Sequence, residues 1–140
     1  MENITKNFIE NPNEENFHLV EISPYALNEV FKRAPNLADQ FFQFNHWYRI
    51  YREANSSPLI LSRMQSLEKT FDDAFKLHYS LGYDERKKHE PRLIELASTV
   101  KECSSTLHLL GNAYRKEIIE KMHEVAVTDE DKEFIKFYKI

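Results

Sequence analysis

A chain of 140 residues with a formal net charge of -4 is long enough to bury a substantial core. Its acidic balance excludes nucleic acid as the main partner, because phosphate binding needs a concentrated basic face. Two glycines and five prolines are too few for a turn-rich β protein and indicate helices joined by short connections.

The cysteine content and the absence of long apolar runs indicate a cytoplasmic protein. The single cysteine, Cys103, excludes an internal disulfide framework and fits a reducing compartment. Residues 1–10 lack the basic start and apolar run of a signal peptide. No window approaches the ~18 apolar residues of a membrane span, so we expect no membrane span.

The first half of the sequence contains residues that typically begin or end helices. Asparagines and a proline near residue 12 predict a loose lead over residues 1–15. Ser23 and Pro24 predict a helix start, because serine caps free amides and proline tolerates the first turn; Pro35 ends this helix. Ser57 and the following proline predict the start of the longest helix, which Gly82 closes as a C-terminal cap.

The second half continues the helical spacing. Pro91 predicts the start of a helix that runs past Val100, and apolar residues from Leu107 to Val125 predict one long amphipathic helix. Thr128, followed by three acids, predicts a capped final helix that is cut short at residue 140. No segment alternates like a strand, so the sequence predicts an all-α fold.

Pro35 is followed at six and nine residues by Phe41 and Phe44. This spacing resembles globins, in which a proline begins the short third helix and a phenylalanine six residues later packs on the haem plane. Ile94–Val100 resembles the proximal globin helix, and Val127–Glu130 resembles the threonine-started final helix. The resemblance implies one globin-like domain over residues 1–140, with a shortened final helix.

The resemblance departs from the globin pattern at the iron ligand. Val100 occupies the position of the proximal histidine, and valine has no lone pair to offer a metal. If haem binds, His89 or His108 would have to be the ligand. However, His89 lies in a polar segment, and His108 lies outside the apolar face that Leu107 and Leu110 form on its helix. Arg63 falls near the distal histidine position, where it either faces solvent or holds a small anion.

The alignment implies a pocket for an apolar ligand or for haem. Its expected lining residues are Phe41, Phe44, Arg63, Leu67, Phe71, Leu96, Val100 and Leu110.

Three functions remain open from the sequence. The first is a globin-like, haem-independent sensor or regulatory module without a cofactor, which holds an apolar molecule such as a fatty acid and acts through a protein partner or a homodimer. The second is a haem globin that binds oxygen or another diatomic gas. The third is a pocketless helical interaction or inhibitor protein, with an exposed apolar patch around Trp47 and Tyr48.

We do not expect an enzyme. The sequence has no phosphate-cradling glycine loop and no nucleophile elbow. Its six histidines form no His-x3-His or Glu-x2-His pattern, so a metal site in a helical bundle has no support.

Overall fold

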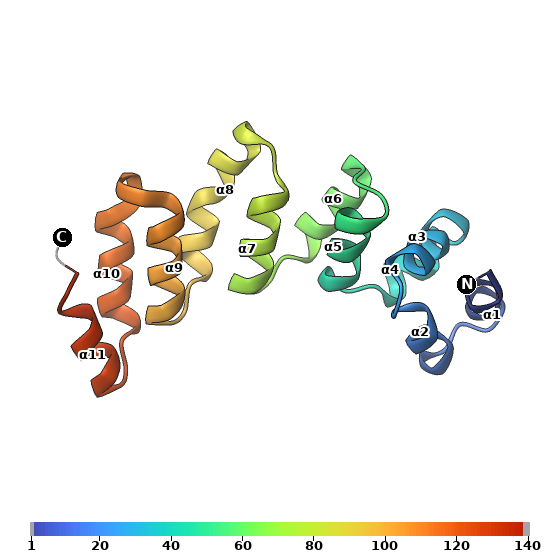
Figure 1. Ribbon diagram of the computed structural model, residues 1–140, viewed down its shortest axis with the longest axis horizontal. Coiled ribbons are helices and arrows are strands. Elements are labelled where there is room, and N and C mark those ends of the chain that lie inside the picture. The colour runs from blue at the N-terminus through green and yellow to red at the C-terminus, as the bar shows by residue number, and fades with distance from the viewer. Residues whose placement is uncertain (1, 139–140) are drawn as a thin grey trace. The chain divides into compact units, whose positions relative to one another are not determined.

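The computed structural model describes residues 2–138 as helices and short connections, with no strand among them (Figure 1). This confirms the predicted all-α class. Within the same residues no helix is long and apolar enough to cross a membrane.

The chain divides into two compact units, Met1–Glu68 and Lys69–Ile140. In each unit the main contacts join helices that are one or two places apart in the sequence. The single globin-like domain over residues 1–140 stays a prediction, and each unit is described by itself below.

The first unit consists of three successive helix pairs. Their bounds are α1 Glu2–Glu10, α2 Glu14–Val20, α3 Pro24–Arg33, α4 Pro35–Phe41, α5 Phe44–Glu53 and α6 Pro58–Leu67. Trp47 lies at the centre of this unit, 1% exposed. Its ring packs edge-on against Phe31 and Phe42, with centroid distances of 5.2 and 5.0 Å. Trp47 is therefore a core residue rather than part of an exposed patch.

The N-terminal lead differs from the prediction of a loose segment. Residues Glu2–Glu10 form helix α1, and the Phe8 side chain is fully buried. The Phe8 ring contacts Phe17 of α2 and Phe41 of α4, with centroid distances of 5.6 and 4.9 Å. Burial of this apolar side chain holds the lead as a helix.

The second unit begins with two helix pairs and ends with one further helix. Their bounds are α7 Phe71–Ser80, α8 Tyr83–Leu96, α9 Val100–Leu110, a 3-10 turn Gly111–Tyr114, α10 Arg115–Val125 and α11 Asp129–Ile135. Figure 1 shows α9 and α10 as antiparallel neighbours. Their shared core consists of Ala97, Val100, Cys103, Leu107, Ile118, Met122 and Ile135.

The predicted long helix after Ser57 is two helices, because Thr70 starts a new one. The Thr70 hydroxyl accepts the Asp73 amide at 3.1 Å, and the Asp73 carboxylate accepts the Thr70 amide at 3.3 Å. This capping box satisfies free donors at the start of α7. Gly82 does not close α7 with a left-handed conformation; it precedes α8 with φ -72°.

The predicted helices of the second half are also divided differently. Pro91 lies inside α8 instead of opening a helix. The segment Ile94–Val100, predicted as one helix, is interrupted after Leu96, and Val100 begins α9 behind its cap Thr99. The predicted long helix from Leu107 breaks at Gly111, whose φ of 67° and ψ of -149° are accessible almost only to glycine.

Alanine substitutions at the two glycines test whether the backbone conformation of Gly111 requires glycine. Gly111→Ala should lower the free energy of unfolding by about 1–3 kcal/mol, because a side chain is strained in that conformation. Gly82→Ala should lower this free energy by less than about 1 kcal/mol, since Gly82 has an ordinary φ and no atom within 4 Å of an added Cβ, and only the preference for glycine over alanine at the N-cap of α8 is lost. Urea denaturation of both variants measures this; equal effects would contradict the strained break.

Candidate functional site

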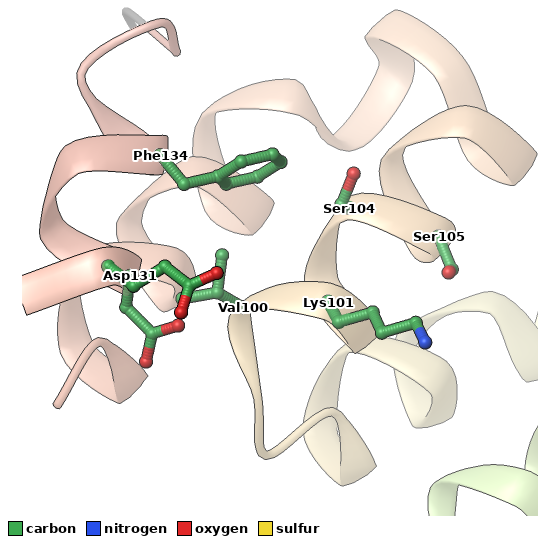
Figure 2. Close-up of a pocket in the computed structure, with 7 residues that line it drawn as sticks. Val100, Lys101, Ser104, Ser105, Asp131 and Phe134 are labelled. Carbon is green, nitrogen blue, oxygen red and sulfur yellow. The ribbon is translucent and has the colours of Figure 1, made fainter. Parts of the chain in front are cut away.

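A groove runs between α9 and α11 in the second unit (Figure 2). It encloses about 260 Å³ and is lined by Val100, Lys101, Ser104 and Ser105 from α9 and by Glu130, Asp131 and Phe134 from α11. We refer to it as the α9–α11 groove. Figure 2 shows Val100 between the side chains of the two walls.

The core beneath the groove positions its walls. Ile135 of α11 is buried in the same core cluster as Val100, which holds α11 against the unit. The neighbouring Phe134 is therefore turned outward and is 41% exposed. Its ring packs against Tyr138 at 5.4 Å, and the Tyr138 hydroxyl lies 3.3 Å from the Ser104 hydroxyl of the opposite wall.

The α11 wall of the groove is acidic. Asp131 caps its own helix, because its carboxylate accepts the Val127 and Thr128 amides at 3.3 and 3.5 Å. Glu130 is exposed beside it. Lys101 is on the other wall, and Figure 2 shows its side chain pointing away from α11. The groove thus combines an apolar base, one aromatic ring and an acidic wall.

A second pocket of the same unit lies among α7, α8 and α9. It encloses about 200 Å³ and is lined by His78, Tyr79, Tyr83, Arg86, Lys87, Glu90, Leu109 and Leu110. We refer to it as the α7–α9 pocket. Arg86 closes the end of α7, because its guanidinium donates to the carbonyls of His78 and Leu81 at 3.2 and 3.1 Å.

The His78 side chain is buried and lacks a hydrogen bond at one of its ring nitrogens. It is 3% exposed, and its buried Nδ1 has no hydrogen-bond partner. Burial lowers the pKa of His78 to about 4, and electrostatic interactions with His89 and Arg86 contribute to this lowering. The ring is therefore neutral at neutral pH.

The free energy of unfolding of the second unit should depend on pH, because the pKa of His78 differs between the folded and unfolded states. Unfolded histidine binds a proton below its ordinary pKa of 6.5, whereas the folded ring does so only below about 4. The unfolded state thus binds more protons between these values, so stability is lost as pH falls from 6.5 towards 4. Relative to His78→Leu, the wild type should lose about 2 kcal/mol between pH 7.5 and pH 5. Urea denaturation at both pH values measures the difference, and parallel profiles would contradict it.

A third pocket, of about 520 Å³, belongs to the first unit. Its lining consists of Glu14, Phe17, His18, Glu21, Gln40, Phe41, Gln43 and His46. We refer to it as the α2–α5 pocket.

A hydrogen-bond network crosses the α2–α5 pocket. His46 Nδ1 accepts the Gln43 amide at 2.9 Å, so Nε2 carries the proton and donates to Glu21 at 2.9 Å. The other Glu21 oxygen lies 2.7 Å from His18 Nδ1. The hydrogen bond to Glu21 raises the pKa of His18, and the bonds from His18 and His46 lower the pKa of Glu21. No group of three or more metal-binding side chains in residues 2–138 is placed to hold an ion.

The predicted pocket residues of the first unit have identifiable contacts. Phe41 packs on Phe8 and lines the α2–α5 pocket, Phe44 is buried and stacks on Tyr48, and Leu67 is half-buried at the end of α6. Arg63 donates to the Asp39 carboxylate at 2.6 and 3.3 Å and lies over the Trp47 ring.

The remaining predicted residues belong to the second unit. Val100 is part of the core cluster and the base of the α9–α11 groove, and Phe71 and Leu110 pack against that cluster. Leu96 is half-buried. Of the two candidate haem ligands, His108 is exposed, whereas the half-buried His89 ring lies 5.8 Å from His78. The eight residues are thus divided equally between the two units, and the pocket that they would form together stays a prediction.

Comparison with known proteins gave no match to a family model, a curated protein or a solved structure. The globin resemblance therefore stays a prediction.

The sequence analysis did not identify the α9–α11 groove or the α7–α9 pocket. A signal for the first was present: Thr99 and Glu102 repeat the capping pattern of Thr128 and Asp131, and mark α9 and α11 as separate helices. Nothing in the local sequence distinguishes His78 from an exposed or fully hydrogen-bonded histidine.

Proposed function

We propose that this chain is a helical interaction module that binds a segment of a partner protein in the α9–α11 groove. The observation that carries the proposal is Phe134, a large aromatic side chain left 41% exposed beside the apolar base at Val100. Aromatic side chains next to a pocket are typical anchors of protein interfaces.

The architecture of each unit supports this proposal. Successive helix pairs contact mainly their neighbours, which is the arrangement of helical-repeat proteins, whose surfaces bind partner proteins. This is an interaction protein, as in the third function left open by the sequence, but it differs from that pocketless prediction because its binding surface is the groove between α9 and α11 instead of a patch around the buried Trp47.

The groove defines the chemistry of the partner segment. Its volume of about 260 Å³ accommodates apolar side chains, and the acidic wall formed by Glu130 and Asp131 favours Lys or Arg beside them. Ser104 and Ser105 add hydroxyl groups on the opposite wall. An amphipathic helix with one apolar and one basic face meets these requirements and uses the helix-in-groove mode of recognition.

Phe134→Ser should lower the affinity for such a segment by about tenfold or more, because it removes the aromatic wall. Phe137→Ser is the matched control, since Phe137 is 83% exposed and does not line the groove. A display library of helical peptides, selected on the wild-type protein, supplies the probes, and titration calorimetry gives their affinities for the three proteins.

We expect the selected peptides to combine apolar anchors with Lys or Arg, and to lose affinity only for Phe134→Ser. Equal affinities for all three proteins, or no enrichment of any peptide, would refute the α9–α11 groove as the binding site.

The globin resemblance leads to a competing proposal, in which the chain holds haem or an apolar ligand in a pocket. Absorbance spectroscopy distinguishes a haem protein from an interaction module. An interaction module should show no stoichiometric Soret band when haemin is added to the folded protein, because Val100 cannot ligate iron. A sharp band that is lost in His89→Ala or His108→Ala would establish haem binding and identify the ligand.

A further inference from the structure

We propose that the partner of the α9–α11 groove is a second copy of this chain, which inserts the Phe137 side chain that follows its own α11. This inference rests on the function proposed for the groove and names its partner. Each copy supplies Phe137 to the groove of the other, so two equivalent sites form in a symmetric dimer.

Phe137 is a large apolar side chain that its own chain leaves uncovered. It is 83% exposed, whereas the nearby Ile135 is buried. The Phe137 amide donates to the Phe134 carbonyl at 3.3 Å, which places Phe137 one turn beyond the aromatic wall of the groove. The groove and the exposed ring are therefore close together on one surface. A contact about a two-fold axis requires this, because the same patch must serve both copies.

The charges of this surface complement one another when two copies of α11 lie antiparallel. The first turn of α11 is acidic, and Glu130 is exposed there on the groove wall, whereas the exposed Lys132 and Lys136 follow towards the other end. An antiparallel neighbour brings Lys136 of one copy beside Glu130 of the other, and the two-fold axis repeats this contact. Opposite charges across an interface favour the pairing and fix its orientation.

Lys136 is available for this contact. Within the chain it pairs with Glu133 at 2.9 Å, but the two side chains are 69% and 71% exposed. An exposed ion pair of this kind contributes little to stability, so Lys136 can exchange it for a carboxylate of the second copy.

The same register also brings the apolar anchor to the groove. If Glu130 of one copy lies beside Lys136 of the other, Phe137 lies beside Asp129. This is the first turn of α11, where Glu130 and Val100 line the groove. The groove encloses about 260 Å³, which accommodates a phenylalanine ring.

Self-association of the full chain is the first test. Sedimentation equilibrium from roughly 10 μM to 1 mM covers the weak affinities expected of a small interface. The wild type should dimerise in this range. Phe137→Ser and Phe134→Ser should each weaken the dimer by about tenfold or more, because one removes the anchor and the other removes the groove wall. A wild type that stays monomeric would overturn the inference, as would a dimer that both variants leave unchanged.

Charge reversal tests the antiparallel contact. Glu130→Lys and Lys136→Glu should each weaken self-association, because like charges then meet in both halves of the dimer. An equimolar mixture of the two variants should restore it, since each of these contacts then joins a lysine to a glutamate. A mixture that associates no better than its components would contradict the antiparallel pairing.

Lys32→Glu is the matched control for charge reversal. Like Lys136, Lys32 pairs with a glutamate three residues earlier, at 3.8 Å, but it lies in the first unit. This variant should leave self-association unchanged, and a loss equal to that of Lys136→Glu would count against a specific contact of α11.

Peptide selection separates this inference from the function on which it rests. Phe137→Ser keeps the groove but lacks the anchor, so it should bind the selected peptides at least as tightly as the wild type while it fails to dimerise. A chain that binds peptides beside Phe134 but stays monomeric overturns the second copy as partner and leaves the proposed function intact. No enriched peptide, together with a dimer that depends on Phe137 but not on Phe134, would overturn both, because the anchor would then lie outside the groove.

Discussion

Capped first turns are the constraint on which the structure depends, because its helices are short. Helices of 7 to 14 residues are marginal in water without packing and caps. Six helix starts in the described residues have a polar N-cap side chain that accepts an amide of the first turn: Asn13, Ser23, Ser57, Thr70, Thr99 and Thr128. Each such cap contributes about 1 kcal/mol. The caps at Thr99 and Thr128 fix where α9 and α11 begin, and therefore which side chains line the groove between them.

Local packing then determines what each unit presents to solvent. Since neighbouring helices bury their apolar faces against each other, grooves between helices remain open to solvent. The α9–α11 groove follows from this arrangement: Ile135 is buried, and Phe134 beside it is exposed. Cys103 belongs to the core beneath the groove, where burial raises the pKa of its thiol to about 11, so it acts as a packing residue.

Two groups of histidines show how the local environment shifts the pKa of this side chain in opposite directions. In the first unit, Glu21 accepts hydrogen bonds from His18 and His46 and links α2 to α5, and the pKa of His18 rises. In the second unit, His78 is buried without such a partner at Nδ1, and its pKa falls. The hydrogen bonds of the first network join two helices, whereas burial keeps the His78 ring neutral at neutral pH.

The sequence by itself determined the helical class and the helix starts at Ser23, Ser57 and Thr128, because a cap is a contact between residues three positions apart. Thr70 and Thr99 carry the same signal, but apolar spacing that continues across them favours unbroken helices. Only the tertiary structure decided which faces meet. The contacts of His46 with Glu21, of Arg63 with Asp39 and of Ser104 with Tyr138 join residues 25, 24 and 34 positions apart. Spacing along one helix cannot specify such pairs, because they depend on how separate helices pack.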